Sequence, residues 1–558
     1  MKFAVYYHPE AYTTSSSQLM GRNAAGESFL RGYFSYTPKD KGNLFVQVQD
    51  ESHGSLFEQT ARQFNRTEQV SIITKSSLET LGDAAGLYYP GPDIGELASH
   101  RRLFGDHLWS LCGITHTTSS AGAMDAIVNL TTTPVMPWDS IICTSNSVKA
   151  NVECILSNQF EFLQKQLGAQ KLTLPMLPVI PLGVHTKDFI FSESVREQSR
   201  ASIGASPDTL VVLYMGRLSF HAKAHPISMY QGLESAAKAT GKNIVLIECG
   251  WHANDALAKA FEEAASLCCP SVRTVQLDGR ETRNREIAWS SADIFCSLSD
   301  NIQETFGIVP IEAMAAGLPV VVSDWDGYKD SVRDGIDGFR VKTLTPLPGL
   351  AGDLAHRHAL GIDNYDMYCG HSSTLVAVDT DAVASSFTNL FESESLRRRM
   401  GEAGRQRAQT LYDWSTIFSR YNDLWTEQNE IRIRENSLTG LKASDAVQRT
   451  VGCWPARLDP TISFSGYPTE HLTRETPLRL GFSSSALACD ALDKYLKLKM
   501  VNYAGYVIPS ITEIRSVLEL ASADHQAAEK LLTGVDAPRR LYVLRGLVWM
   551  IKIGLLRL

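Results

Sequence analysis

The sequence predicts an α/β protein with two parallel-sheet domains and a C-terminal extension that is mostly helical. Its 558 residues exceed what one compact core normally holds. Short β-branched runs alternate with amphipathic or alanine-rich stretches through most of the first 420 residues, which is the pattern of parallel strands covered by helices. This alternation falls into two blocks and stops near residue 432. We therefore expect two similar domains followed by a region of another kind.

The first block, residues 1–190, contains strand candidates at 3–7, 113–117, 140–143 and 179–180. The second block, residues 191–432, contains strand candidates at 209–216, 243–249, 273–279, 292–298 and 319–324. Residues 343–380 have several Pro, Gly and His and no clean period, so we expect an insertion loop there. Residues 395–427 predict two helices.

Residues 433–558 form the predicted C-terminal extension, which is rich in Ser, Thr and Pro until about residue 485 and helical afterwards. The tail from Pro538 carries five cations and no acid, and its apolar residues alternate with the cations. Two interpretations stay open. The favoured one is a terminal helix that docks on its own domain, because long cationic side chains can snorkel. The other is a helix that lies on a membrane surface.

Composition limits the classes of function. With 44% apolar and 20% charged residues, the chain has the composition of an ordinary soluble globular protein. A net charge of −8 argues against nucleic acid as a general partner, so we expect none. The first residues lack the long apolar region and the cleavage site of a signal peptide, so we expect no secretion, and no unbroken apolar stretch of about 20 residues predicts a transmembrane helix. The ten cysteines form no CxxC pair and predict buried thiols in a reducing cytoplasm.

The most informative segment is residues 299–339, SDNIQETFGIVPIEAMAAGLPVVVSDWDGYKDSVRDGIDGF, which places Glu304 and Glu312 around a turn and a short helix. Pro310 suits the first turn of that helix, and Gly317 suits its left-handed cap. Unpaired N–H groups at the start of the helix favour an anion such as a diphosphate. These N–H groups belong to Thr305, Phe306, Gly307 and Ile308. If the helix begins near Gly307, Glu312 lies about 7 Å along its axis, so the two carboxylates suit different parts of one hydroxyl-rich ligand.

This segment closely resembles the E-x7-E signature of retaining glycosyltransferases of family 4, through the spacing of the two Glu, the following glycine, EAMAAGLPVVVSD and the DGIDGF turn. The resemblance implies the GT-B fold, in which two Rossmann-like domains face each other across a cleft. It further implies that Glu304 holds hydroxyls of the donor sugar and that Glu312 holds the nucleotide ribose. The alternative is that Glu312 only decorates an exposed helix face.

A second element, MGRLSFHAKAHP at residues 215–226, follows a predicted buried strand. Its Arg217 and Lys223 therefore lie at a sheet's carboxyl edge, where open α/β folds bind ligands. These cations can neutralise the charge that develops on a departing diphosphate. The stretch resembles the family's diphosphate element, but its Arg to Lys spacing is one residue longer and Ala224 replaces the usual Gly. Two solvated surface cations are the alternative.

Four further residues are candidates for the site. Gly21 lies in a predicted glycine loop before a helix that we expect to begin near Ala25, and such a loop can bring N–H groups to a phosphate or sugar. His116 ends a predicted strand of the first block; the resemblance implies a polar contact with sugar hydroxyls, whereas a structural histidine is the alternative. Gly250 and Arg280 close strands of the second block, where the family holds the nucleotide base.

No metal site is expected, because Asp324 and Asp326 in SDWDGYKD are more simply explained as a turn at a strand end. The resemblance implies an enzyme that moves a sugar from a nucleotide-diphosphate donor to a hydroxyl acceptor with retention, without a tightly bound cofactor or a required metal. It also implies that a crossover helix, about residues 412–427, returns to the first domain. By analogy the acceptor is a bacterial surface glycan or its lipid carrier. We expect a cytoplasmic protein and leave open a peripheral position at the inner face of the membrane.

Two rival functions stay open. A sugar phosphorylase or a sugar-nucleotide epimerase would keep the fold and change the reaction. A non-catalytic scaffold would use the C-terminal extension to bind a partner.

Overall fold

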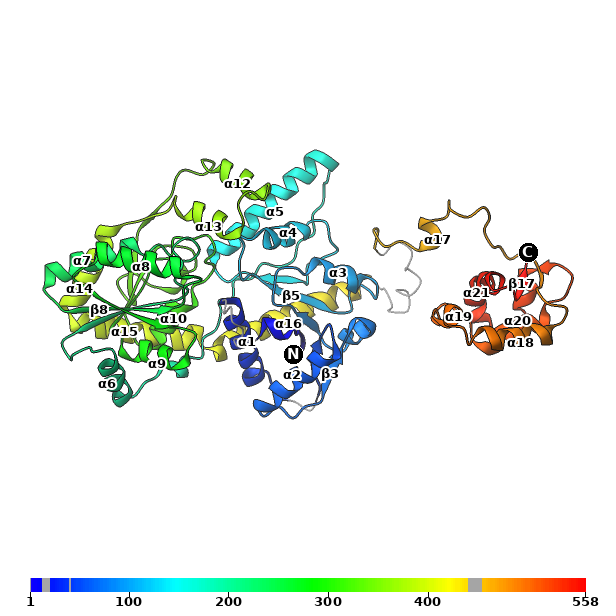
Figure 1. Ribbon diagram of the computed structural model, residues 1–558, viewed down its shortest axis with the longest axis horizontal. Coiled ribbons are helices and arrows are strands. Elements are labelled where there is room, and N and C mark those ends of the chain that lie inside the picture. Colours follow the sequence, from blue (N-terminus) through cyan, green and yellow to red (C-terminus); the bar gives the residue numbers. More distant parts are fainter. Residues whose placement is uncertain (1, 13–20, 40–41, 440–453) are drawn as a thin grey trace. The chain divides into compact units, whose positions relative to one another are not determined.

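The computed structural model describes residues 2–12, 21–39, 42–439 and 454–558 (Figure 1). The chain divides into two compact units, Met1–Pro455 and Ala456–Leu558. The first unit holds two six-stranded sheets, and the second holds a small three-stranded sheet.

The first sheet is entirely parallel and has the strand order β3-β2-β1-β4-β5-β6. Its strands are β1 (Phe3–Tyr6), β2 (Leu44–Gln47), β3 (Val70–Ile73), β4 (Gly86–Tyr88), β5 (Ser110–Ile114) and β6 (Ser140–Ile142). The accompanying helices are α1 (Gly21–Tyr36), α2 (Glu51–Gln63), α3 (Gly95–Arg102), α4 (Ala121–Asn129) and α5 (Asn146–Leu167). We call this part of the unit the first lobe.

The second sheet repeats the same plan, with the order β12-β11-β10-β7-β8-β9 and all pairs parallel. Its strands are β7 (Leu210–Met215), β8 (Ile244–Gly250), β9 (Arg273–Asp278), β10 (Ile294–Ser297), β11 (Val320–Ser323) and β12 (Gly338–Val341). The accompanying helices are α6 (Glu193–Ser202), α7 (Ile227–Thr240), α8 (Asp255–Cys268), α9 (Thr282–Ser291), α10 (Ile308–Ala315), α11 (Tyr328–Ser331), α14 (Thr380–Glu392) and α15 (Glu394–Arg407). This is the second lobe.

Both sheets have the Rossmann strand order, in which the order reverses between the first and fourth strands. The reversal lies between β1 and β4 in the first lobe and between β7 and β10 in the second. Apolar side chains from both faces of each sheet are buried against helices, which explains why β7 and β8 are almost unbroken apolar runs. The predicted α/β fold class, with two Rossmann-like lobes, is confirmed.

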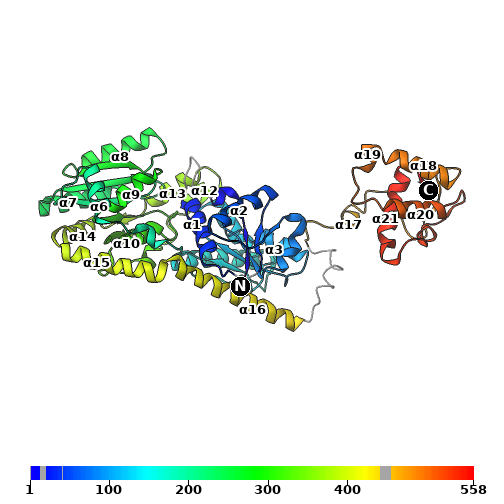
Figure 2. The ribbon, with the colours of Figure 1, turned by 90° about the horizontal axis from the view of Figure 1, so that it is seen from below.

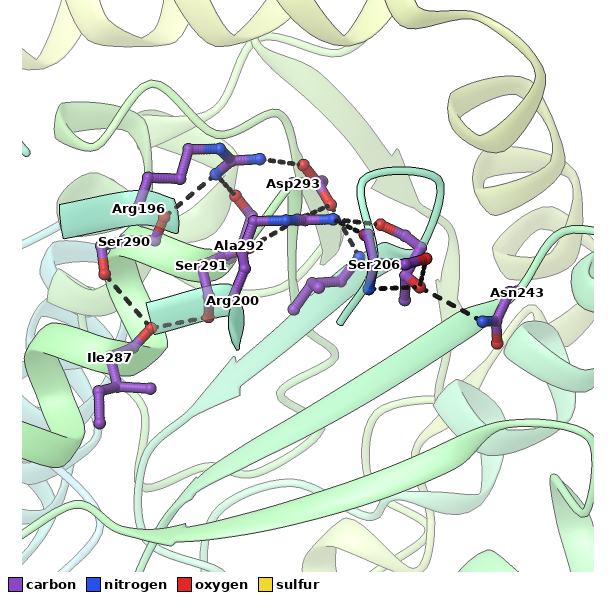
Figure 3. A network of polar contacts seen from close by, with 11 residues as sticks. Arg196, Arg200, Ser206, Asn243, Ile287, Ser290, Ser291, Ala292 and Asp293 are labelled. Atoms are coloured by element: carbon purple, nitrogen blue, oxygen red, sulfur yellow. Dashed lines mark hydrogen bonds and ion pairs between the residues drawn. The ribbon is translucent and has the colours of Figure 1, made fainter. Parts of the chain in front are cut away.

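A network of polar contacts ties α6 to the second sheet at the edge where β10 begins (Figure 3). Asp293 pairs with Arg196 at 2.5 Å and with Arg200 at 3.0 Å, and it accepts the N–H of Val211 at 2.8 Å. The two arginines also donate to main-chain carbonyls of Ser290, Ser291, Ala292, Ser206 and Thr209. These bonds satisfy the hydrogen-bonding capacity of the largely buried Asp293 carboxylate. They also fix the amino-terminal ends of β7 and β10.

The helix α16 (Trp414–Thr439) follows a short π-helical turn, Ala408–Tyr412, and runs along the first lobe (Figure 2). Trp425 stacks on Phe3 with ring centroids 4.7 Å apart. The Gln428 amide donates to the carbonyls of Leu111 and Trp138, at 2.9 Å each. The chain thus returns from the second lobe to the first, as the resemblance implies, and the helix continues past residue 432, where the extension was expected to begin.

The prediction of a loop at residues 343–380 is wrong. This insertion contains β13 (Thr343–Leu344), α12 (Gly352–Ala359), α13 (Tyr365–Ser373) and β14 (Ala377–Val378). Asp363, between the two helices, accepts from Arg357 at 2.8 Å and from His371 at 3.0 Å, and the Asn364 side chain caps α13. Polar side chains hold these helices in place. Because such contacts need no regular spacing of apolar residues, the sequence pattern did not predict the helices.

Two predicted boundaries also differ. α1 begins at Gly21 rather than near Ala25, so Gly21 belongs to the helix and not to a glycine loop before it. Gly26 lies inside α1 and packs so closely that a Cβ there would lie 2.0 Å from the carbonyl oxygen of Ala11. Residues 179–180 form a single bridge between Val179 and Cys143 rather than a strand.

The second unit builds its own core around an antiparallel sheet of β15 (Pro477–Leu480), β16 (Gln526–Ala527) and β17 (Leu556–Arg557). Its helices are α17 (Pro460–Ser463), α18 (Ser485–Tyr495), α19 (Lys499–Asn502), α20 (Ile511–Leu520) and α21 (Arg540–Lys552). Val543, Leu547 and Met550 of α21 are fully buried, which confirms that the C-terminal tail docks on its own domain. No helix within the described ranges is both long and apolar enough to cross a bilayer.

Candidate functional site

The predicted charged residues meet where the strand order of the second sheet reverses. Arg217 and Lys223 lie in the loop after β7, and Glu304 lies in the loop after the neighbouring strand β10. The Lys223 ammonium pairs with the Glu304 carboxylate, with Nζ and Oε2 2.5 Å apart. The Glu304 side chain is only 9% exposed. The longer spacing between Arg217 and Lys223 therefore does not keep Lys223 from the site.

Glu304 remains ionised although it is nearly buried. Burial by itself raises the pKa of this carboxyl, but the Lys223 ammonium and the N–H groups of Thr305 and Gly307 outweigh burial, and the pKa ends below its usual value. A charged carboxylate with free lone pairs can accept hydrogen bonds from ligand hydroxyls. Two of the N–H groups that we expected to meet a ligand anion thus face Glu304 in this structure.

Arg217 lies beside the same loop. Its guanidinium donates to the carbonyl of Ala222 at 2.8 Å and to the Gln303 side-chain oxygen at 2.9 Å. Both Arg217 and Lys223 are half-buried and engaged with site residues, so they are not two freely solvated surface cations. The site carries two cations next to one carboxylate.

The turn before α10 requires a glycine at position 307. Gly307 caps the helix with φ of 78°, and a Cβ there would lie 1.8 Å from the Tyr328 ring. Phe306 directs its side chain into the apolar core, so it can serve a ligand only through its backbone. Ile308 is the first residue of α10, and Gly317 takes the predicted left-handed conformation after the helix, with φ of 79°.

Glu312 lies on α10 and is partly buried. Burial raises its pKa to about 7, and the nearby Arg285 opposes that rise. Among the described residues, its carboxyl group has no hydrogen-bond partner. Arg285, from α9, is a site neighbour that sequence reasoning missed; its position next to Glu312 depends on how α9 and α10 pack. Its guanidinium also donates to the carbonyl of Gly279 at 2.9 Å.

Gly250 and Arg280 end β8 and precede α9, respectively. A Cβ at Gly250 would lie 1.9 Å from the carbonyl oxygen of Gly216, so this glycine lets the ends of β7 and β8 approach each other beside Arg217. The Arg280 guanidinium pairs with Asp278 at 2.7 Å, and it forms no hydrogen bond or ion pair with Glu304 or Glu312 in the part of the chain described.

The first lobe reaches the site through the loop after β5. The Thr305 hydroxyl donates to the carbonyl of His116 at 3.2 Å, and the Thr144 hydroxyl donates to the carbonyl of Thr305 at 3.3 Å. His116 therefore lies against the neighbour of Glu304, and its side chain is half-buried. Gly21 is the first residue of α1 rather than part of a loop, and residues 13–20 before it lie outside the described residues.

Two acids join the lobes. The sequence pattern assigned Asp326 to a turn and did not single out Asp330. Asp326, which has φ of 41°, accepts the Ser145 hydroxyl at 2.9 Å, and burial raises its pKa to about 7. Asp330 accepts the Asn146 N–H at 2.7 Å. Both carboxyl groups meet the N-terminus of α5, where the helix dipole favours negative charge. Asp326 thus has a structural partner across the lobes, which its sequence position alone does not show.

A third acid lies in the loop after β10. Asp300 is buried, its carboxyl accepts the His225 N–H at 3.2 Å, and burial raises its pKa to about 7. Throughout the described ranges, no group of three or more His, Cys, Asp or Glu side chains is placed to hold a metal ion.

Comparison with known proteins gives the following matches. Residues 195–346 match the family model described as Glycosyl transferases group 1. The chain is 33% identical over 151 residues to the phosphatidyl-myo-inositol mannosyltransferase of Mycobacterium leprae, a match that covers 26% of this chain and 30% of that protein. It is 22% identical over 316 residues to the putative glycosyltransferase EpsD of Bacillus subtilis, covering 53% of this chain and 68% of EpsD.

Among solved structures, HepE of Anabaena in complex with UDP is similar, with 15% identity and a TM-score of 0.49 over 76% of this chain and 100% of HepE. The segment that matches the family model contains the four charged residues Arg217, Lys223, Glu304 and Glu312. The second lobe therefore contains the segment that matches the glycosyl transferases group 1 model.

Proposed function

We propose that this protein is a retaining glycosyltransferase of the family 4 type, which moves a hexosyl group from a nucleotide-diphosphate donor to a hydroxyl acceptor. The observation that carries the proposal is the Lys223–Glu304 pair beside Arg217, where the strand order of the second sheet reverses. Open α/β sheets bind ligands at that position. A ligand with both a diphosphate and several hydroxyls matches two cations next to an ionised carboxylate.

Arg217 and Lys223 would stabilise the departing nucleoside diphosphate. Cleavage of the bond between the sugar's anomeric carbon and the phosphate oxygen leaves negative charge on that oxygen, and nearby cations lower the barrier. The acceptor oxygen would form its bond on the same face of the sugar, and the acceptor proton would pass to the leaving phosphate oxygen. The proposal includes no protein nucleophile, no tightly bound cofactor and no required metal.

Glu304 and Glu312 would hold the two ends of the donor. Glu304 keeps its charge through Lys223, so it can accept hydrogen bonds from sugar hydroxyls while Lys223 turns to the diphosphate. Glu312 would accept hydroxyls of the ribose, with Arg285 favouring its charged form. The N–H groups of Phe306 and Ile308 would assist at the diphosphate, since those of Thr305 and Gly307 face Glu304. Contacts between the lobes at Asp326 would exclude water and so limit donor hydrolysis.

For the acceptor we propose a glycan or lipid-linked glycan, in the synthesis of a bacterial surface polysaccharide. By its name, the Mycobacterium leprae relative acts on phosphatidyl-myo-inositol, an acceptor that combines hydroxyls with apolar chains. That relative matches only part of this chain, so the acceptor class is a matter for experiment.

The test uses the full chain with UDP-, GDP- and ADP-sugars. We expect one nucleotide class to raise the melting temperature and to release nucleoside diphosphate when a hydroxyl acceptor such as an octyl glycoside is added. Glu304→Gln should lower turnover at least 100-fold and keep the fold. A dependence on inorganic phosphate would favour a phosphorylase, and sugar conversion without an acceptor would favour an epimerase. A non-catalytic scaffold would be favoured if wild type released no nucleoside diphosphate and Glu304→Gln left binding of a partner by the C-terminal extension unchanged.

We also propose that a surface of the second unit binds the cytoplasmic face of a membrane peripherally. The apolar face of α21 is buried, so another surface must make this contact. Residues 494–512 contain no acid, and they expose Met500, Tyr503 and Tyr506 at 81%, 76% and 91% next to Lys497 and Lys499. Aromatic side chains and lysines suit the headgroup region of anionic lipids. Flotation with phosphatidylglycerol vesicles, and not with phosphatidylcholine vesicles, is expected; Tyr503→Ser together with Tyr506→Ser should abolish it.

A further inference from the structure

The insertion at residues 343–380 places α13 between the two lobes. In both views α12 and α13 lie between the helices of the second lobe and those of the first (Figures 1 and 2). The Tyr365 hydroxyl, at the start of α13, lies 3.4 Å from the hydroxyl of Thr117 and 3.4 Å from that of Ser119. Both partners belong to the loop after β5. The insertion thus grows from the second lobe and touches the first.

The same helix packs on the loop that carries the two cations. A Cβ at Gly370 would lie 3.0 Å from the Cβ of His221, so no larger residue fits there without movement. The Cys369 thiol is buried and lies close to the side chains of Ser119, Tyr365 and Arg217. α13 therefore contacts both loops that border the candidate site.

The loop after β5 also contacts the loop that carries Glu304. The carbonyl of His116, one residue before Thr117, accepts the hydroxyl of Thr305, the neighbour of Glu304. Thr117 therefore lies one residue from a contact with the loop that holds Glu304. Separations of 3.4 Å are at the long end for bonds between hydroxyls, so the half-buried Thr117 and Tyr365 hydroxyls keep capacity for a ligand, whereas Ser119 is buried.

We propose that Tyr365 is a positioning residue on the acceptor side, where its hydroxyl, together with Thr117 and held in place beside the buried Ser119, orients the hydroxyl-bearing acceptor toward the donor. This inference rests on the proposed function and assigns to the insertion a role in choosing the acceptor. Leu360, Ile362 and Met367, which flank Tyr365 in the sequence, are exposed. An acceptor that joins sugar hydroxyls to an apolar chain fits this combination.

The test compares Tyr365→Phe with Tyr368→Phe in the full chain. Tyr368 is the matched control because it lies on the same helix and stacks on His358 with centroids 4.1 Å apart, while its hydroxyl has no hydrogen-bond partner among the residues described. The donor is the sugar nucleotide that wild type turns over, and the acceptor probe is octyl glucoside. Tyr365→Phe should raise KM for the acceptor about 5-fold and change KM for the donor less than 2-fold. Tyr368→Phe should change neither.

The role of Tyr365 would be overturned if both variants had the same acceptor KM, or if Tyr365→Phe raised the KM values for acceptor and donor equally. Absence of turnover in wild type with every sugar nucleotide would instead refute the proposed function. The two failures are therefore distinguishable.

A cross-link tests the placement of α13 without relying on turnover. In Ser119→Cys, oxidation by diamide should join position 119 to the native Cys369, because their side chains are in contact and disulfides form only at short range. Ser119→Cys combined with Cys369→Ser is the control and should not cross-link. Rapid cross-linking in the first variant supports the enclosure of the site by α13, and its failure would contradict it.

Discussion

Glu304 and Lys223 stand 81 residues apart in the chain, and Glu304 depends on Lys223 for its charge state. A buried carboxylate without a partner would take up a proton. Together, and with two backbone N–H groups, they keep an ionised acid beside a cation. The carboxylate, which can accept hydroxyls, therefore lies directly beside the ammonium, which can bind phosphates.

We predict that Lys223→Met costs about 1–3 kcal/mol of stability, because it leaves the Glu304 carboxylate without its ion partner. The loss should raise the pKa of Glu304, so the acid limb of the activity profile should move to higher pH. Chemical denaturation and a pH–rate profile measure the two effects. Lys223→Arg keeps the positive charge and should keep most of the stability. An unchanged acid limb in Lys223→Met would mean that Lys223 does not control the charge of Glu304.

At Gly307, backbone conformation and space both require glycine. We predict that Gly307→Ala is more destabilising than Gly335→Ala, by about 1–3 kcal/mol of overpacking. Gly335 is the matched control because it has φ of 72° but no other heavy atom within 4 Å of the position that a Cβ would take, so it tests left-handed strain alone. Thermal unfolding measures both variants. Equal losses would show that the Tyr328 ring moves aside freely.

At the scale of elements, the N-terminus of α5 gathers the contacts between the lobes. Ser145 caps this helix by accepting the Val148 N–H at 3.1 Å, and it also donates to Asp326. Asp330 accepts the next N–H along the chain, that of Asn146. A single helix end therefore joins the segment after β11, which includes Asp326 and the short helix α11 with Asp330, to the first lobe.

The raised pKa of Asp326 has a consequence for stability. Because the folded-state value of about 7 exceeds the ordinary value of 3.8, this group's contribution is fully present below pH 3.8 and is lost as the pH rises toward 7. We predict that Asp326→Asn, which cannot ionise, gains about 1–2 kcal/mol relative to wild type between pH 5 and pH 8. Urea unfolding at the two pH values measures the difference. A constant difference would show that Asp326 titrates normally.

At the scale of the whole molecule, the chain consists of two units with separate cores. Leu478, Leu492, Val517 and Leu547 of the second unit are buried among residues of that unit only. We predict that residues 456–558 expressed alone unfold cooperatively, since their apolar core needs no residue from the first unit. Thermal unfolding followed by near-UV circular dichroism measures this. A fragment without a cooperative transition would show that the core is completed elsewhere.

Much of the site was predictable because parallel strands bring their carboxyl ends to one edge. Arg217 and Lys223 follow one buried strand and Glu304 follows another, so the sheet itself places them together. The local sequence also determined the glycine at 307 and the left-handed Gly317, which are properties of single turns. Arg285, Asp326 and Tyr365 could not be found in this way, because each becomes part of the site only through packing against an element that is distant in sequence.

By itself the sequence determined the α/β class, the presence of two parallel-sheet lobes and the loop chemistry at 217, 223, 304 and 312, since these follow from short-range patterns of apolar and turn residues. Only the tertiary structure decided that residues 343–380 fold into helices that touch both lobes, that Asp326 and Asp330 meet α5, and that α21 buries its apolar face. The physical reason is that burial and long-range hydrogen bonds select among the local conformations that a sequence permits, and those partners are not neighbours along the chain.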